Sequence, residues 1–463
     1  ADGLDNDCDG LESCFGDGDS DGYAGFQTRV DSVDLDCVDA GEYDDYDDCD
    51  DGNGSINPGA VDLPDMGFVD SNCDDIDGDE SKALFVTEGG DDASPDCSMD
   101  EPCASIREAM RRLDGSRDQV LVQTGTYSAY ASESDVGVYG GYDATWGRDD
   151  LFSGAITTIE GGNYDPGNDD QFMAIRLASV SGVVLQNLEI EGTDVTETDS
   201  NGRGKPSYGL YIDDADVVVE NSRIRGARGA DTNDGADAVD LDQLGAPAGL
   251  SGFVAQTTTC DSNGRLGRPG AEHTCGALST DGGDGGDSGS VTCGFPVNSG
   301  QDGEEGSDGS GGAQGGAEGQ AGVSANGRDG DPGDPGDEGN DGISTAGGNS
   351  GFFNNNYYTP LPSPNGGNGS AGEGGAGGGG GAGYSDSVST DQRGGSGASG
   401  GAGGCGGTGG NGGSAGGASI AIQASNNSVL ELINSEVIGG TGGNGGDGGD
   451  GGLGEPGGLG GTG

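Results

Sequence analysis

Carboxylates recur at alternate positions in the first 80 residues, and each run ends in a glycine. Two such runs are Asp5-Asn6-Asp7-Cys8-Asp9-Gly10 and Asp17-Gly18-Asp19-Ser20-Asp21-Gly22. A hard cation such as Ca²⁺ takes about six to eight oxygen ligands, which alternate side chains on a tightly turning loop can supply together. We therefore expect this segment to bind several Ca²⁺ ions. The candidate ligands are Asp5, Asp7, Asp9, Asp17, Asp19, Asp21, Asp48, Asp50, Asp51, Asn53, Asp70, Asn72, Asp74, Asp75, Asp77 and Asp79.

These runs are not EF-hand loops, because their twelfth positions are Gly16 and Thr28 and lack the bidentate glutamate. Residues 1–80 carry 27 Asp or Glu residues against one base, Arg29. Bound divalent cations would offset the repulsion among these carboxylates and supply folding free energy. The alternative is a solvated acidic tail, but such a tail does not place Asp, Gly and Cys at regular spacing.

The composition of the whole chain excludes several classes of function. Its 463 residues include 107 glycines, and its formal net charge is -66. Nucleic acid is excluded as a partner, since phosphates would be repelled and no basic stripe could release their counterions. The only lysines are Lys82 and Lys205, and the only histidine is His273, so catalysis would depend on carboxylates and metal. No apolar stretch approaches the roughly 18 residues that a transmembrane helix needs.

Eleven cysteines lie mostly at short separations in acidic loops. This pattern is typical of disulfides and of an oxidising compartment, whereas the Cys-x-x-Cys or Cys/His spacing of zinc sites is absent. We predict that Cys97 bonds to Cys103, and that the three cysteines within residues 260–293 supply one further bridge. Cys405, alone in a glycine-rich run, is predicted to be free or to bond to another chain.

Short β-branched runs begin after residue 81, and they repeat. Residues 183–192 match residues 217–226 at an offset of 34, and residues 430–439 are a third copy. Upstream, residues 209–212 match residues 419–422. Such units cannot bury an apolar face alone, so they stack. Short strands joined at a recurring Asn predict a right-handed parallel β-helix with an Asn ladder, and a β-sandwich is the alternative.

One helix is expected among these strands, from Ser105 to Leu113. Ile106, Met110 and Leu113 would share one apolar face of this helix. Ser105 would be its N-cap, because a serine hydroxyl can accept a hydrogen bond from a free backbone N–H of the first turn.

Residues 229–417 and 439–463 are rich in glycine, which often recurs every third residue. A period of three is that of polyproline II, in which Gly occupies the places where backbones touch. A collagen-like triple helix needs an unbroken register, which slips here at Gly311-Gly312 and Gly315-Gly316. A bundle of polyglycine II helices tolerates such slips, so we favour the bundle over collagen and over a disordered spacer.

The expected fold class is therefore mostly β. We expect an acidic calcium-binding loop module in residues 1–80, a right-handed parallel β-helix in 81–228, a polyglycine II-like insertion in 229–417, a further coil in 418–438 and a Gly-Gly-X repeat in 439–463. The chain opens inside a motif and stops inside a repeat, so we expect it to be part of a longer protein.

Two segments resemble known families. Residues 2–10, 17–23, 48–51 and 57–60 closely resemble the metal-binding repeat of MopE-like bacterial surface proteins, and residues 70–78 are a variant return of that repeat. Residues 102–106, 125–127 and 140–148 resemble the entry to the pectate-lyase-like β-helices of secreted bacterial proteins. The resemblance implies a large, calcium-dependent protein of the cell surface.

Together these features predict a secreted or cell-surface structural protein without enzymatic activity, located outside the cell. It would self-associate into a fibre, filament, matrix or adhesive layer, and a polysaccharide is a further candidate partner. The alternative is a β-helix lyase or hydrolase acting on polysaccharide, with Asp213, Asp214 and Asp216 beside Arg223 and Arg225. Because these acids straddle a turn and both arginines point the same way along a strand, an exposed ion-pair network is the simpler account.

Overall fold

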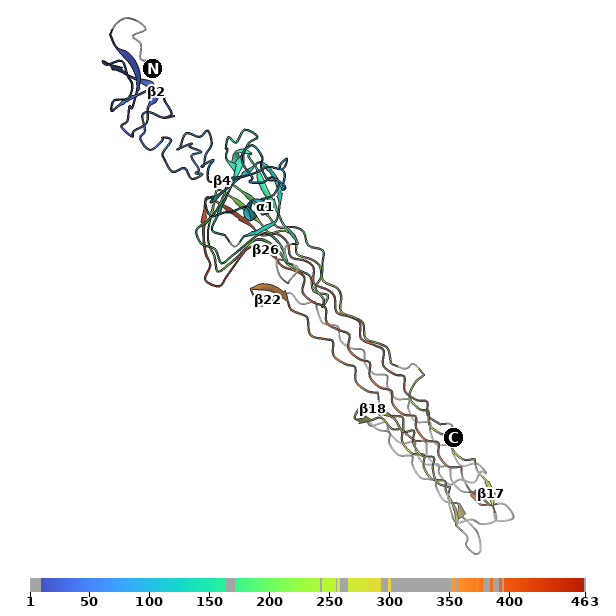
Figure 1. Cartoon of the computed structure of the whole chain (residues 1–463). Helices are drawn as coiled ribbons and strands as arrows, with labels where there is room; N and C mark the ends of the chain where they lie inside the picture. Colours follow the sequence, from blue (N-terminus) through green and yellow to red (C-terminus); the bar gives the residue numbers. More distant parts are fainter. Residues whose placement is uncertain are drawn as a thin grey trace. The chain divides into compact units, whose positions relative to one another are not determined.

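The structure is a computed structural model that describes residues 10–132, 134–163, 171–241, 244–254, 256–258, 265–292, 299–300, 351–354, 356–372, 374–377, 384–385, 391–393 and 395–461. The chain divides into two compact units (Figure 1). Unit 1 comprises Ala1–Asp231, Gly351–Pro360 and Gly416–Asn444, and unit 2 comprises Thr232–Ser350, Leu361–Ala415 and Gly445–Gly463. Regular structure is mostly β, which agrees with the expected fold class.

Three sheets with almost entirely parallel pairing form the body of unit 1. Their strands are β4 (Ala83–Val86), β5 (Gln119–Gln123), β6 (Gly125–Ser128), β7 (Tyr130–Ser132), β8 (Gly137–Tyr142), β9 (Thr157–Glu160), β10 (Gly162–Asn163), β11 (Phe172–Ala178), β12 (Val183–Gln186), β13 (Glu189–Glu191), β14 (Ser207–Asp213), β15 (Asp216–Glu220), β16 (Arg223–Arg225), β26 (Ser419–Ser425), β27 (Val429–Ile433) and β28 (Glu436–Ile438). The sheet orders are β27-β15-β12-β8-β5-β4, β28-β16-β13-β9-β6, and β10-β11-β14-β26 with β7 beside β11. Because successive strands visit the three sheets in turn, the arrangement is consistent with a β-helix-like fold.

The strand register confirms the predicted alignment of the three repeats. Val217 pairs with Val183 on one side and with Leu430 on the other. Asn221 and Asn187 both have positive φ, and the Nδ2 of Asn221 donates to the Oδ1 of Asn187 at 3.0 Å. The recurring Asn therefore makes the expected ladder contact between these two repeats, because Asn tolerates the left-handed turn and bonds along the stack.

The register predicted for the upstream segment is wrong by two residues. The sequence comparison placed residues 209–212 opposite residues 419–422, whereas Ser207 pairs with Ser419 and Leu210 with Ile422. A slip of two residues leaves every side chain on the same face of the strand, so alternation alone cannot detect it.

The core of unit 1 lies between the parallel sheets and is aliphatic. In β15, Val217 and Val219 are buried while Asp216 is exposed. A second apolar cluster covers the opposite face of the first sheet, where Trp146 packs edge-on against Phe85 with ring centroids 4.7 Å apart. Both faces of β4 and its neighbours are therefore shielded from solvent, as expected for buried parallel strands.

The helix α1 (Ile106–Arg111) confirms the expected helix but ends two residues before Leu113. The Oγ of Ser105 accepts a hydrogen bond from the N–H of Glu108 at 3.2 Å, so the predicted N-cap is correct. Ile106 is fully buried, and Met110 and Leu113 pack against the core. A single 3-10 turn, η1 (Leu151–Ser153), follows β8.

Antiparallel strands complete unit 1. Near the N-terminus, β1 (Glu12–Gly16) lies between β2 (Gly25–Ser32) and β3 (Glu42–Tyr43). A hairpin of β22 (Gly351–Asn354) and β23 (Tyr357–Pro360) packs on β14, where the rings of Tyr357 and Tyr211 stack at 5.0 Å. The hairpin therefore belongs to unit 1 although glycine-rich sequence surrounds it.

Extended segments of unit 2 run beside one another and are joined by backbone hydrogen bonds at intervals of three residues (Figure 1). The N–H groups of Gly446, Gly449 and Gly452 donate to the carbonyls of Ser414, Asn411 and Thr408. The N–H groups of Gly366, Gly369, Gly372 and Gly375 donate to the carbonyls of Gly410, Gly407, Gly404 and Gly401. Gly397, Gly400 and Gly403 donate to the carbonyls of Gly286, Gly283 and Thr280. Residues 396–415 therefore bond to several neighbouring segments through different sides of one extended chain.

Glycine is required at these contacts because the backbones approach closely. A Cβ atom added at Gly404, Gly407 or Gly410 would overlap the carbonyl of Glu455, Gly452 or Gly449, respectively. Any larger residue would separate the segments and break their hydrogen bonds.

Short antiparallel strands join the segments of unit 2. They are β17 (Gln256–Thr258), β18 (Thr274–Cys275), β19 (Leu278–Ser279), β20 (Val291–Thr292), β21 (Ser299–Gly300), β24 (Tyr384–Ser385) and β25 (Asp391–Arg393). The pairings are β17-β25-β24, β18-β19 and β20-β21.

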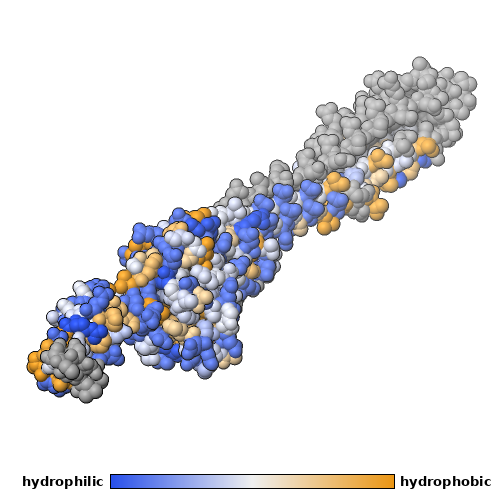
Figure 2. All heavy atoms as spheres, turned by 90° about the horizontal axis from the view of Figure 1, so that it is seen from above, coloured by the Kyte–Doolittle hydropathy of each residue, from blue (hydrophilic) through white to orange (hydrophobic). Residues whose placement is uncertain are grey.

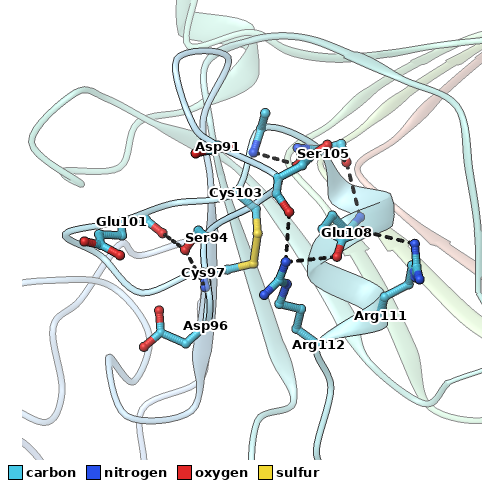
Figure 3. Close-up of a disulfide and its surroundings, with 12 residues drawn as sticks. Asp91, Ser94, Asp96, Cys97, Glu101, Cys103, Ser105, Glu108, Arg111 and Arg112 are labelled. Atoms are coloured by element: carbon cyan, nitrogen blue, oxygen red, sulfur yellow. Dashed lines mark hydrogen bonds and ion pairs between the residues drawn. A yellow bond between two sulfur atoms is a disulfide. The ribbon is translucent and has the colours of Figure 1, made fainter.

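Four disulfides lie within the described residues. Cys97 bonds to Cys103 beside α1, as predicted (Figure 3). In the same region Ser94 donates to the carbonyl of Glu101 at 2.7 Å, and Arg112 pairs with Glu108 at 3.0 Å. The other bonds are Cys14–Cys37, Cys49–Cys73 and Cys275–Cys405.

The prediction that Cys405 is free or bonds to another chain is therefore wrong. Its partner, Cys275, is 130 residues away in the sequence, and the packing of extended segments in unit 2 brings the two together. The predicted bridge within residues 260–293 would join two of Cys260, Cys275 and Cys293. Cys275 bonds to Cys405 instead, and Cys260 and Cys293 lie outside the described residues.

The visible surface is dominated by hydrophilic residues, with smaller apolar areas among them (Figure 2). Within the described residues, no helix has both the length and the apolar character needed to span a membrane.

Candidate metal centre

The loop between β1 and β2 carries Asp17, Asp19 and Asp21, and the turn after β3 brings Asp48 and Asp51 toward it. The N–H of Asp48 donates to the carbonyl of Ala24 at 3.1 Å, which fixes the turn beside the end of the loop. A carboxylate oxygen from each of Asp17, Asp19 and Asp21 lies within 4.8 Å of the others. Two segments about 30 residues apart are thus assembled into one acidic site.

Two of these acids, Asp17 and Asp51, accept hydrogen bonds that stabilise the conformation of the loop. The carboxylate of Asp17 accepts hydrogen bonds from the N–H groups of Ser20 at 2.6 Å and Gly22 at 2.9 Å. Asp51 accepts from the N–H of Gly18 at 2.6 Å and from the hydroxyl of Thr28. These bonds hold the loop in a tight turn, as carboxylates commonly do in Asx turns.

The remaining carboxylate oxygens have no hydrogen-bond partner although they are shielded from solvent. They are both oxygens of Asp19, the Oδ2 of Asp21 and the Oδ2 of Asp48. Asp48 is only 5% exposed. A buried carboxylate oxygen without a donor is unfavourable, so this arrangement is incomplete as a protein-only structure.

The electrostatics of the site agree with its geometry. Burial raises the pKa of Asp19, and the charges of Asp21, Asp17 and Asp51 raise it further. Burial likewise raises the pKa of Asp48, again with contributions from neighbouring carboxylates. A divalent cation would counteract both causes of the raised pKa values, because it would bond to the orphaned oxygens and compensate the neighbouring negative charges.

The donor set consists of oxygen atoms only, which favours Ca²⁺ over zinc or other soft metals. Asp19, Asp21 and Asp48 would hold the ion, and Asp17 and Asp51 would keep the loop closed around it. Two other candidates from the same part of the sequence, Asp50 and Asn53, are exposed in a turn. The structure does not bring these two into the group of orphaned oxygens.

The second acidic candidate group is arranged differently. Asp70 accepts from the N–H groups of Asp74 at 3.1 Å and Asp75 at 2.8 Å. Asp74 accepts from the side chain of Asn72 and from the N–H of Glu80, both at 2.9 Å or less. These carboxylates therefore close turns.

Two members of this second group pair with bases. Asp77 is buried and forms an ion pair with Arg148 at 2.7 Å, and Asp79 pairs with Lys82 at 3.0 Å. Burial raises the pKa of Asp77, and the neighbouring Arg148 guanidinium lowers it. Metal binding by residues 70–79 remains a prediction.

The structure adds acids that spacing did not identify. Asp62 is 1% exposed and accepts from the N–H groups of Ser71 and Gly78, each at 3.1 Å. Asp34, Asp36 and Glu42 form a further close group near the Cys14–Cys37 bond. Asp62 has no acid at an alternate position, and the alternation of Asp34 and Asp36 stops at Val38 without reaching a glycine, so spacing marks both sets less clearly than the two runs. Asp5, Asp7 and Asp9 lie outside the described residues.

Asp213 and Arg223, which were considered for polysaccharide chemistry, are engaged by other residues and not by one another. Asp213 accepts from the Oγ of Ser425 at 2.9 Å and from the Nδ2 of Asn356 at 3.3 Å. Arg223 bridges Glu189 and Glu436, at 3.4 Å and 2.9 Å. Arg223 therefore belongs to an ion-pair network, but its partners are glutamates and not the aspartates that the sequence suggested.

Comparison with known proteins finds no counterpart, since no family model matches the chain and no curated protein or solved structure is significantly similar to it.

Proposed function

We propose that this chain is a calcium-stabilised structural protein of an extracellular surface, and that it builds a fibre or matrix layer by self-association. Residues 1–80 would be its calcium-binding module, the sheets of unit 1 a right-handed parallel β-helix, and unit 2 a polyglycine II bundle. The observation that carries the proposal is the backbone hydrogen bonding of residues 396–415 to several neighbours at a period of three.

That bonding pattern supports a mechanical role. Ordering glycine costs more backbone entropy than ordering any other residue, so a glycine-rich bundle is stable only when many amide bonds form together. Such a bundle resists extension because its segments must part cooperatively. Any backbone amide left unpaired at an edge of such a bundle would favour association with a further chain.

Calcium and disulfides support the extracellular setting. A cation would bind the orphaned oxygens of Asp19, Asp21 and Asp48. Extracellular modules typically bind Ca²⁺ with dissociation constants of about 10⁻⁴–10⁻³ M. Four disulfides in the described residues agree with an oxidising compartment.

The proposal predicts calcium-dependent assembly. Negatively stained native material should contain filaments or sheets with Ca²⁺ present, and these should lose order in excess chelator. The same samples should show new protease cleavage within residues 1–80, because the carboxylates repel one another once the ion is removed. Monodisperse single chains with Ca²⁺ present, or unchanged protease resistance in chelator, would contradict the proposal.

A further inference from the structure

The only histidine of the chain lies beside a disulfide in unit 2. The hairpin of β18 and β19 turns at Gly276, whose φ is +64°, and it carries His273 and Cys275. The hairpin packs against the segment that contains Cys405. A third segment brings Glu455 to the same place, because the N–H of Glu455 donates to the carbonyl of Cys405 at 2.8 Å.

Four potential ligand groups converge there. The Nε2 of His273 lies 2.9 Å from the Oε2 of Glu455 and 3.5 Å from the Sγ of Cys405. The ligand atoms of His273, Cys275 and Cys405 all lie within 4.8 Å of one another. The side chains of His273 and Glu455 are 23% and 12% exposed, so the group is sheltered but can be reached from solvent.

The disulfide alone does not account for this arrangement. A cross-link between Cys275 and Cys405 needs neither an imidazole nor a carboxylate, and Cys97–Cys103 is fully buried without either at its sulfurs. Here the Glu455 carboxylate is also held in place by the N–H of Cys405, at 3.3 Å. Two thiolates, an imidazole and an oriented carboxylate are the ligand types of a tetrahedral zinc site.

We propose that His273, Cys275, Cys405 and Glu455 form a binding site for Zn²⁺ or a similar transition metal when the Cys275–Cys405 bond is reduced. A dithiol reductant supplies two electrons and its own two thiol protons and becomes a disulfide. A phosphine supplies two electrons and takes the oxygen of one water to become a phosphine oxide, while the two protons of that water complete the thiols. Metal binding then displaces both thiol protons into solvent, and the cation bonds to two sulfurs, one nitrogen and one oxygen.

The two states link the bundle differently. The disulfide joins the hairpin to the segment containing Cys405, whereas the metal also ties in the segment containing Glu455. The inference does not depend on calcium binding or on assembly, since all four ligands lie in unit 2.

Cobalt is the probe of choice, because Co²⁺ replaces Zn²⁺ and a thiolate–cobalt charge-transfer band reports sulfur ligation alone. The full chain, reduced with a phosphine and saturated with Ca²⁺ to occupy carboxylate sites, is titrated anaerobically with Co²⁺. The expected result is a charge-transfer band that the unreduced chain lacks. His273→Ala or Glu455→Gln should weaken Co²⁺ binding at least about tenfold, since even loss of a supporting residue around a metal costs about 10–100-fold.

Two matched controls separate this site from other reduced cysteines. The pair Cys275→Ser/Cys405→Ser should lose the band, whereas Cys97→Ser/Cys103→Ser should keep it. Glu272→Gln, an exposed neighbour of His273, should bind Co²⁺ like the parent chain. No band in the reduced chain, or a band that persists without Cys275 and Cys405, or one indifferent to both His273→Ala and Glu455→Gln, would overturn the proposal.

Discussion

At the scale of the residue, Asp48 shows how the structure separates a candidate metal ligand from an acid in an exposed turn. Alternating spacing identified it together with Asp50, yet only Asp48 is buried with an oxygen that lacks a donor. Sequence spacing could not separate the two, because burial depends on how the turn after β3 docks on the β1–β2 loop. The sequence thus supplied the candidate acids, and the structure selects among them those whose shielded oxygens lack a donor.

We expect Asp48→Asn to weaken Ca²⁺ binding at least about tenfold, or about 1.4 kcal/mol, since it removes one anionic ligand. Asp50→Asn is the matched control, because Asp50 lies two residues away and is exposed, and the change should leave the affinity nearly unchanged. Calorimetric titration of both variants checks this. Equal losses in the two variants would mean that the acids act only through their summed charge.

Asp62 provides a test by pH. Burial raises its pKa to about 6, outweighing the N–H groups of Gly78 and Ser71, which act in the opposite direction. The folded chain therefore retains a proton that the unfolded chain releases near pH 4, so the contribution of Asp62 to stability falls as pH rises from about 4 to 6.

Asp62→Asn cannot titrate, so the variant should gain stability relative to wild type as pH rises through this window, by at most roughly 3 kcal/mol. Urea unfolding of both proteins with Ca²⁺ present at several pH values gives the difference directly, since other titrating groups are common to both. A difference that does not vary between pH 4 and pH 6 would show that Asp62 ionises normally in the folded chain.

At the scale of the element, strand positions were predictable and some registers were not. The runs that became β5, β12 and β15 are rich in β-branched residues, and Asn187 and Asn221, which follow β12 and β15, fixed the alignment of these two repeats. No Asn follows β14, so the sequence could not distinguish its true register with β26 from one shifted by two residues. Such a shift keeps every side chain on the same face of the strand. The Cys275–Cys405 bond was also unpredictable, because it depends on which glycine-rich segments become neighbours.

Single glycines should differ sharply in their tolerance of substitution. A Cβ at Gly410 would overlap the carbonyl of Gly449, whereas a Cβ at Gly367 would meet nothing within 4 Å. We expect Gly410→Ala to destabilise unit 2 by about 1–3 kcal/mol, as overpacking does, and Gly367→Ala to have little effect. Thermal unfolding in the presence of Ca²⁺ checks both variants, and equal unfolding temperatures would contradict the close packing of these segments.

At the scale of the whole molecule, the composition that would suggest a flexible spacer instead supports a hydrogen-bonded bundle. A net charge of -66 and 107 glycines leave few apolar side chains for a core, so much of the stability must come from backbone bonding and disulfides, to which the proposed Ca²⁺ ions would add. Periodicity at three residues was the sequence signal for the bundle. Which segments pair, and in which direction, depends on turns whose geometry composition does not reveal.

Amide hydrogen exchange of unit 2 in the intact chain tests the central claim most directly. The account predicts that the N–H groups of Gly446, Gly449 and Gly452, which donate to Ser414, Asn411 and Thr408, exchange at least on the order of 10³-fold more slowly than an unstructured chain. Protection should recur at every third residue along this segment. Rapid exchange throughout residues 396–415 and 445–461 would show that these segments are a flexible spacer and would contradict the structural role proposed here.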